Sequence, residues 1–294
     1  MTEIIQKIKI IFLDLLRWKK PTGRLLILIP ALWSLCLSSD KYPDFFITLK
    51  IILGALLVSG LACVSNDIWD KDIDKKVERT KNRPLPSENL NVTTAYIILF
   101  ILILFSFLLT LTLPKNNRIL SIKLSFIVLI LILIYPSTKR WFVIPQLILS
   151  LCLGFTILIP WSIIQGNLNS YVLLYCWLAT IFWTFGFDTI YSLLDINDDR
   201  KIEINSSSIF LGDNVKKTIQ ICYLLTYIFL GFSAIKKKLY YTFWPIWIVT
   251  LIMVQKDVLK LFKNDSENKN KYLRHFQNQV IYGGLILLAI IISS

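Results

Sequence analysis

Long apolar runs recur along this sequence, and they restrict the possible fold more than any other feature. Nine runs can be placed in the 294 residues, most of them long enough to cross about 30 Å of hydrocarbon as a helix. The mean hydropathy of +0.62 argues against a soluble domain. We therefore expect an all-α polytopic membrane protein, a bundle of nine transmembrane helices around a central cavity. The predicted spans are residues 25–39, 45–65, 92–113, 119–135, 142–161, 171–187, 218–235, 239–254 and 279–292.

An acidic stretch, residues 66–74, directly follows the second apolar run. On a helix that turns about 100° per residue, Asp67, Asp70 and Asp74 share one face, whereas Asp72 points away from it. Three carboxylates stacked without cations beside them repel one another. A bound cation between them would remove this repulsion, and hard divalent metals prefer oxygen ligands.

A second stretch of the same kind follows the sixth apolar run. Asp188, Tyr191, Asp195 and Asp199 lie at i, i+3, i+7 and i+11 and are predicted to share one helix face, with Asp198 off that face. The two stretches hold eight of the nineteen acidic residues. Taken alone, each stretch would also fit an acidic helix end exposed to solvent. The repetition after two membrane-length runs favours one shared site at the mouth of the bundle.

Basic segments lie close to both acidic stretches. The loop 75–87 carries Arg83, and a short loop between the fourth and fifth spans carries Lys139 and Arg140. Cations beside metal-binding carboxylates predict a pocket for a metal–polyphosphate complex, although the sequence has no Gly-rich phosphate loop. Lys20 and Arg24 flank the start of the first span, where basic side chains also anchor helices at the membrane surface.

Lysine and arginine are unevenly distributed between the two sides of the predicted bundle. If successive spans alternate in direction, 24 of the 32 basic residues fall on the side of the N-terminus and both acidic stretches. The positive-inside rule places that side in the cytoplasm, of a bacterial inner (plasma) membrane or a thylakoid. The run Lys236–Lys238 is the exception. The net charge of +13 then indicates topology and contact with the lipid bilayer, so no nucleic acid and no obligate protein partner is expected.

The rest of the chain gives few further signals. We expect one domain over residues 1–294, in which residues 1–24 form a cytoplasmic amphipathic segment at the membrane surface. The five cysteines have no paired spacing and indicate small core residues. The single histidine, His275, falls in a polar stretch, 256–277, that resembles a plain linker, and we interpret it as incidental.

Taken together, these motifs resemble the UbiA family of membrane aromatic prenyltransferases over nearly the whole chain. The family pattern Asn-Asp-x-x-Asp-x-x-x-Asp is matched by residues 66–74, and Asp-x-x-Tyr-x-x-x-Asp-x-x-x-Asp by residues 188–199. Segments 79–86 and 135–140 resemble the 4-hydroxybenzoate branch of that family.

Other positions are most similar to the cyanobacterial members of this branch. These are Arg24 after Gly23, and the run Asn205-Ser206-Ser207. Two positions depart from the family pattern, because Glu203 stands where a glycine is common and Asn205 where many proteobacterial members have a lysine.

The resemblance implies transfer of a polyprenyl group, for this branch solanesyl, from its diphosphate to the ring carbon ortho to the hydroxyl of 4-hydroxybenzoate, in plastoquinone or ubiquinone biosynthesis. Two Mg²⁺ ions would bridge the diphosphate to the aspartates. The implied metal ligands are Asp67, Asp70, Asp74, Asp195 and Asp199. The implied substrate contacts are Asn66, Arg83 and Lys139 for the diphosphate, Arg140 for the benzoate carboxylate, Asp188 or Tyr191 for the phenol, and Lys20.

Two groups of alternatives are kept open. An ion-coupled membrane transporter would also carry acids in its spans, but near the bilayer midplane and within broken, repeat-related helices. Within the enzyme class, the acceptor could be homogentisate, a dihydroxynaphthoate, chlorophyllide or haem, because no residue spacing encodes the acceptor.

Overall fold

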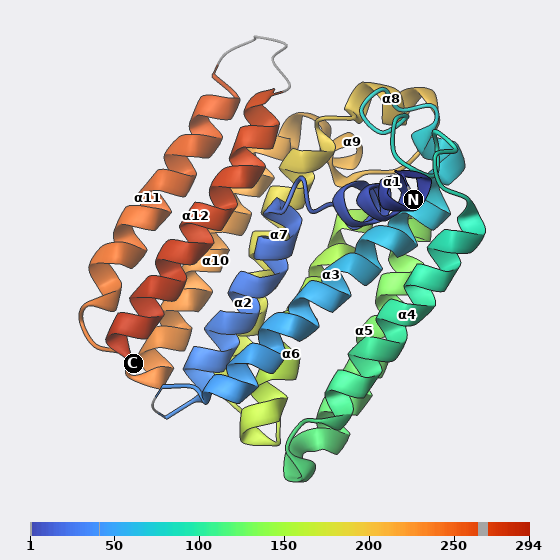
Figure 1. The fold of residues 1–294 in the computed structure, drawn as a ribbon. Helices are drawn as coiled ribbons and strands as arrows, with labels where there is room; N and C mark the ends of the chain where they lie inside the picture. Colours follow the sequence, from blue (N-terminus) through green and yellow to red (C-terminus); the bar gives the residue numbers. More distant parts are fainter. Residues whose placement is uncertain (1, 41, 264–269) are drawn as a thin grey trace.

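The computed structural model describes residues 2–40, 42–263 and 270–294. The described residues are predominantly helical and form a bundle (Figure 1). The helices are α1 (Thr2–Lys9), the π-helical segment η1 (Ile10–Leu15), α2 (Thr22–Ser38), α3 (Phe45–Asp74), α4 (Val92–Leu111), α5 (Lys115–Thr138), α6 (Pro145–Gln165), α7 (Tyr171–Ser192), α8 (Ile196–Lys201), α9 (Ser207–Leu211), the 3₁₀ turn η2 (Gly212–Asn214), α10 (Val215–Lys237), α11 (Phe243–Leu261) and α12 (Asn270–Ser293).

Each predicted span coincides with a helix, which confirms the all-α membrane fold. Within the described ranges, seven helical segments are long and apolar enough to cross a membrane. The helix α2 has only 17 residues, and α11 carries Lys256, Asp257 and Lys260 near its end. The length and apolar character of the seven segments make this an integral membrane protein. The figure of nine spans stays a prediction.

The main apolar core lies where α7 packs against α6, α10 and α12, with α2 and α11 completing it. Tryptophans in this core have polar partners, as buried indole N–H groups require. The Nε1 of Trp33 donates to the carbonyl oxygen of Gly283 at 3.0 Å, and that of Trp183 to Oε1 of Gln279 at 2.9 Å. The helix α4 buries only Ala95 within the bundle, so most of its apolar surface is available to lipid.

The helix α3 is longer than the membrane requires, and this positions the first acidic stretch. Its 30 residues extend about 45 Å at 1.5 Å per residue, against about 30 Å of hydrocarbon. The acidic residues occupy the last turns, beyond the apolar run. Figure 1 shows α1, α8 and α9 gathered at the end of the bundle where α3 finishes, with the C-terminus at the opposite end.

The structure corrects the interpretation of His275. The helix α12 begins at Asn270, so His275 lies on a helix and is fully buried. Its Nδ1 is 2.9 Å from a carboxylate oxygen of Asp257, and its Nε2 is 2.8 Å from the hydroxyl of Tyr223 and 3.0 Å from the amide nitrogen of Gln279. His275 and Asp257 are thus polar residues of this stretch that pair within the bundle, as buried polar groups require. Residues 264–269 of the predicted linker lie outside the described residues.

The run Lys236–Lys238 now has a structural explanation. It ends α10, where Lys238 adopts a left-handed conformation (φ 60°) as the C-cap. The Nζ of Lys237 donates to the carbonyl oxygen of Ser39 at 2.7 Å and ties α10 to the end of α2. Cations at a helix C-terminus are stabilised by the helix dipole. The cysteines are free and largely buried, as predicted.

Candidate active site

The three predicted aspartates of α3 lie on one buried face. The exposed fractions of Asp67, Asp70 and Asp74 are 0%, 2% and 5%, whereas Asp72 is exposed. The helical spacing therefore separated inward from outward carboxylates correctly. Three ionised carboxylates in such a place need cations close to them, because burial of an unpaired charge is costly.

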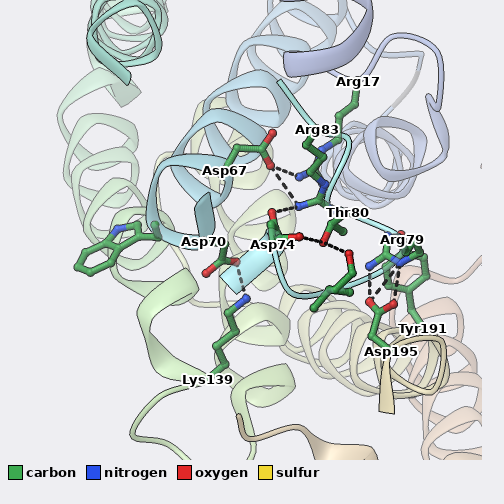
Figure 2. Close-up of polar contacts among 12 residues, drawn as sticks. Arg17, Asp67, Asp70, Asp74, Arg79, Thr80, Arg83, Lys139, Tyr191 and Asp195 are labelled. Carbon is green, nitrogen blue, oxygen red and sulfur yellow. Dashed lines mark hydrogen bonds and ion pairs between the residues drawn. The ribbon is translucent and has the colours of Figure 1, made fainter. Parts of the chain in front are cut away.

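Basic side chains from three separate segments supply those cations (Figure 2). A carboxylate oxygen of Asp67 lies 2.5 Å from Nη2 of Arg17 and 3.3 Å from Nη1 of Arg83. The same Nη1 of Arg83 donates to Asp74 at 2.7 Å. The Nζ of Lys139 donates to Asp70 at 2.5 Å. Each inward aspartate is thus neutralised by a side chain from another element.

The second acidic stretch is broken where the sequence predicted a continuous helix face. The helix α7 ends at Ser192, residues 193–195 form a turn, and α8 begins at Ile196. Asp195 lies in that turn, where its carboxylate accepts two N–H groups of Arg79, from Nε at 2.9 Å and from Nη2. The Nη1 of Arg79 donates to the hydroxyl of Tyr191 at 2.9 Å. This fork-like pair holds the 75–91 loop against the end of α7.

Both stretches nevertheless line the same cavity, which confirms the predicted convergence. Its volume is about 690 Å³, and its wall includes Asp70 and Asp74 from α3 together with Asp188, Asp195 and Asp199 from the second stretch. Arg17, Arg79, Arg83 and Lys139 line it as well. The cavity therefore combines carboxylates and fixed cations at one end of an apolar bundle, which suits a polyanion bound through metal ions.

The residues present fit a divalent cation. One carboxylate oxygen of Asp67, Oδ2, is fully buried and has no hydrogen-bond partner. Burial, together with the charge of Asp195, raises the pKa of Asp199 to about 7, so a cation beside this carboxylate would offset an existing cost. Within the described residues, no three acidic, histidine or cysteine side chains are grouped closely enough to hold one ion by themselves. Mg²⁺ commonly takes one or two carboxylates and completes its shell with phosphate oxygens and water.

The basic side chains are crowded. Burial and the neighbouring charge of Arg17 lower the pKa of Arg83. Burial also lowers the pKa of Arg79, but the hydrogen bonds and charge of Asp195 reverse this and raise it above its ordinary value. The cations are thus held by the carboxylates in this state and repel one another. A diphosphate would relieve that repulsion.

Comparisons with known proteins agree with this geometry. The model of the UbiA prenyltransferase family matches residues 27–279. A 4-hydroxybenzoate solanesyltransferase of Synechocystis sp. is 39% identical over 95% of this chain and 94% of its own. A 4-hydroxybenzoate octaprenyltransferase of Psychromonas ingrahamii is 35% identical over 75% of both chains. The chain belongs to the UbiA prenyltransferase family.

Solved structures share the UbiA fold. The apo structure of a UbiA homologue from Aeropyrum pernix has a TM-score of 0.74 and 21% identity, covering 92% of this chain and 97% of that one. A UbiA homologue from Archaeoglobus fulgidus, bound to GPP and Mg²⁺, has a TM-score of 0.69 and 15% identity, covering 94% of this chain and 99% of that one. At these sequence identities the similarity shows a shared fold alone.

Three further predicted site residues, Asn66, Lys20 and Arg140, differ in whether they reach the cavity. Asn66 and Lys20 line the cavity. Arg140 is absent from the cavity wall, and its guanidinium donates to the carbonyl oxygens of Trp69 at 2.7 Å and Pro136 at 3.2 Å. It also lies 5.8 Å from the ring centre of Trp69. Its Nη2 also lies 3.5 Å from a carboxylate oxygen of Asp70, so Arg140 contacts a residue of the cavity wall from behind and does not line the cavity itself.

Sequence reasoning did not select two cations of the site, Arg17 and Arg79. Their partners Asp67 and Asp195 are 50 and 116 residues away, so no local spacing signalled these pairs. One departure from the family pattern has a visible consequence. Glu203 has a φ of 57°, in the left-handed region that glycine adopts without strain.

Proposed function

We propose that this protein transfers a polyprenyl group, solanesyl by its similarity to the Synechocystis relative, from its diphosphate to the ring carbon ortho to the hydroxyl of 4-hydroxybenzoate. This would serve plastoquinone or ubiquinone biosynthesis. The observation that carries the proposal is the shared cavity in which two aspartate clusters meet basic side chains at one end of an apolar bundle, among them Arg17, Arg79, Arg83 and Lys139. A prenyl diphosphate has the same division into a charged head and an apolar tail.

Mg²⁺ would be held by Asp67, Asp70 and Asp74 on one side and by Asp195 and Asp199 on the other. When bound it would neutralise the negative charge that develops on the departing diphosphate. Asp67 does not line the cavity itself, but its Oδ2 is buried without a hydrogen-bond partner, which supports a cation beside it.

The basic side chains of the cavity would bind the diphosphate. Arg83 and Lys139 are paired with aspartates in the described state, and metal binding to those aspartates would free them to contact phosphate oxygens. Arg17 and Arg79 are placed to do the same. Asn66, which lines the same wall, can donate a further hydrogen bond.

The chemistry needs no covalent enzyme nucleophile. The bond between C1 of the prenyl group and the diphosphate oxygen breaks, and the diphosphate leaves with the electron pair. The ring carbon ortho to the hydroxyl then forms the new carbon–carbon bond and loses its proton to water or to the diphosphate. Asp188 and Tyr191 line the cavity and would orient the hydroxyl. Positioning and charge stabilisation would account for the catalysis.

We infer that the site opens on the cytoplasmic side, because the excess of lysine and arginine lies at that end of the bundle. The N-terminal segment 1–24 would lie on the same membrane face. The transporter alternative receives no support, since the carboxylates occupy the last turns of α3 instead of the middle of a span.

Membranes containing the protein, incubated with Mg²⁺, 4-hydroxybenzoate and prenyl diphosphates of several lengths, test the proposal. We expect a prenylated product that carries the intact carboxylate, with homogentisate, dihydroxynaphthoate and chlorophyllide as competing acceptors. Asp67→Ala and Asp195→Ala should abolish product formation while the protein still inserts. Asp72→Asn, an exposed neighbour on the same helix, is the matched control. Normal turnover in either alanine variant would contradict the metal assignment.

A further inference from the structure

A second cationic position lines the cavity apart from the aspartate clusters. Arg24, at the start of α2, is only 5% exposed and forms part of the cavity wall. Among the described residues it makes no ion pair with any carboxylate, unlike Arg17, Arg83 and Lys139. A buried guanidinium without an anionic partner is costly and calls for an explanation.

The hydrogen bonds of Arg24 leave part of its guanidinium unsatisfied. Its Nη1 donates to the carbonyl oxygen of Leu56 at 3.3 Å, and its Nη2 donates to that of Leu16. Its Nε is buried and has no partner. The ring of Trp18 covers one face, with the guanidinium carbon 4.3 Å from the ring centre. A carboxylate binds a guanidinium in the plane of its fork through two parallel hydrogen bonds, so a ligand at Arg24 would compete with the long contact of Nη1 to the carbonyl oxygen of Leu56.

The position of Arg24 separates it from the diphosphate end of the cavity. The carbonyl of Leu56 points along α3 toward Gly60, four residues on. Gly60 precedes Asp67 by seven residues, or about 10 Å along the helix. Arg24 therefore lies on the membrane-embedded side of the aspartates, beside Ser59, Ala62 and Cys63 in the cavity wall. This small-residue wall suits a flat ring better than a hydrated polyphosphate.

We propose that Arg24 binds the carboxylate of the aromatic acceptor and thereby sets specificity for an aromatic acid. This assignment rests on the proposed prenyl transfer and takes the role first given to Arg140, which does not line the cavity and already has an anionic partner, Asp70, at 3.5 Å. An acceptor held at Arg24 by its carboxylate directs its hydroxyl-bearing end toward the aspartates. The ring carbon that reacts then faces the end of the cavity where the diphosphate leaves.

The first test compares acid and neutral acceptors in the unchanged protein. The probes are 4-hydroxybenzoate and 4-hydroxybenzamide, which differ in charge and little in shape. Equilibrium binding to the detergent-solubilised protein without prenyl donor should favour the acid. Equal affinity for the amide would overturn the proposal, and this arm needs no variant.

The second test replaces Arg24. In Arg24→Gln we expect the KM for 4-hydroxybenzoate to rise about 10- to 100-fold, the usual worth of a charge-assisted hydrogen-bonded pair. The KM for the prenyl diphosphate and the affinity for 4-hydroxybenzamide should stay unchanged. Arg24→Lys should recover only part of the preference, since an ammonium lacks the planar fork. The matched control is Arg118→Gln, because Arg118 also donates to a backbone carbonyl, that of Leu113, at a distance from the cavity.

Three results would overturn the assignment. One is a raised KM for the prenyl diphosphate in Arg24→Gln, which would make Arg24 a diphosphate contact. Another is loss of the acid preference in Arg140→Gln while Arg24→Gln and Arg24→Lys retain it. A third is an unchanged KM for the acid in Arg24→Gln. If the unchanged protein binds another aromatic acid in place of 4-hydroxybenzoate and Arg24→Gln abolishes that binding, the acceptor named under the proposed function fails and the role of Arg24 stands.

Discussion

Asp67→Asn tests whether the ion pair between Arg17 and Asp67 holds the N-terminal segment on the active site. Asp67 is fully buried, and Arg17 reaches it from the turn after η1 at 2.5 Å. Arg83 keeps a second partner, Asp74, after the change, whereas Arg17 makes no other ion pair among the described residues. The substitution keeps the shape of the side chain and removes its charge, so its main effect falls on Arg17.

The expected size of the effect follows from exposure. A hydrogen bond to a charged group contributes about 1.5–3 kcal/mol. The side chain of Arg17 is 32% exposed, so water can replace part of what Asp67 provides, and we take the lower value of about 1.5 kcal/mol. Since 1.4 kcal/mol is a factor of ten, the fraction of molecules with a detached segment should rise about tenfold.

Hydrogen exchange followed by mass spectrometry measures this fraction. Backbone amides of the segment, such as Leu16 bonded to the carbonyl of Ile11 and Lys19 bonded to that of Leu13, should exchange about tenfold faster in Asp67→Asn. Peptides from α10 should not change. Asp72→Asn serves as the control. Unchanged exchange in residues 4–19, or the same acceleration in both variants, would refute the reasoning.

Three further changes test separate contacts of the site and the core. Arg79→Gln should lower turnover at least about tenfold and raise the KM for the prenyl diphosphate, because the bidentate contact with Asp195 is lost. A steady-state assay with varied donor measures both quantities, and an unchanged donor KM would contradict the prediction. Lys139→Gln should weaken donor binding in the presence of Mg²⁺ by roughly tenfold, since one phosphate contact disappears; equal affinity in a direct binding assay would argue against that role. His275→Ala should destabilise the bundle by about 2–4 kcal/mol, because two buried partners, Tyr223 and Gln279, and the half-buried Asp257 lose their common contact. Thermal unfolding in detergent measures this, and an unaltered midpoint would show that the network adds nothing.

The tertiary structure decided which charges meet. Arg17, Arg79 and Lys139 reach aspartates 50, 116 and 69 residues away, and the sequence near each residue carries no record of its partner. Ionic contacts of this kind depend on where loops return to the bundle. The same reason explains Arg140, which is next to Lys139 in sequence and also reaches Asp70, at 3.5 Å, but donates its shorter hydrogen bond to the carbonyl oxygen of Trp69 and does not line the cavity.

Outside the first acidic stretch, the sequence did not show which polar side chains are buried. His275 stands among polar residues, and only the packing of α12 against Tyr223 and Asp257 shows that this polarity faces inward. The break after Ser192 was missed because the spacing of aspartates continues through it, while the backbone turns so that Asp195 can meet Arg79. In the sequence, Arg24 looks like a basic residue that anchors a span at the membrane surface. Only its place in the cavity wall shows that it differs from such an anchor.

By itself the sequence determined the membrane bundle and the inward face of the first acidic stretch. Both follow from local rules, since apolar length sets what can cross the hydrocarbon and a 100° turn per residue sets which side chains share a face. It also determined that two such stretches exist, and the family patterns in them imply prenyl transfer. The two stretches were predicted to share one site, and the cavity confirms this. The fold alone decided which cations neutralise them, because charges interact through space and their distances are set by packing.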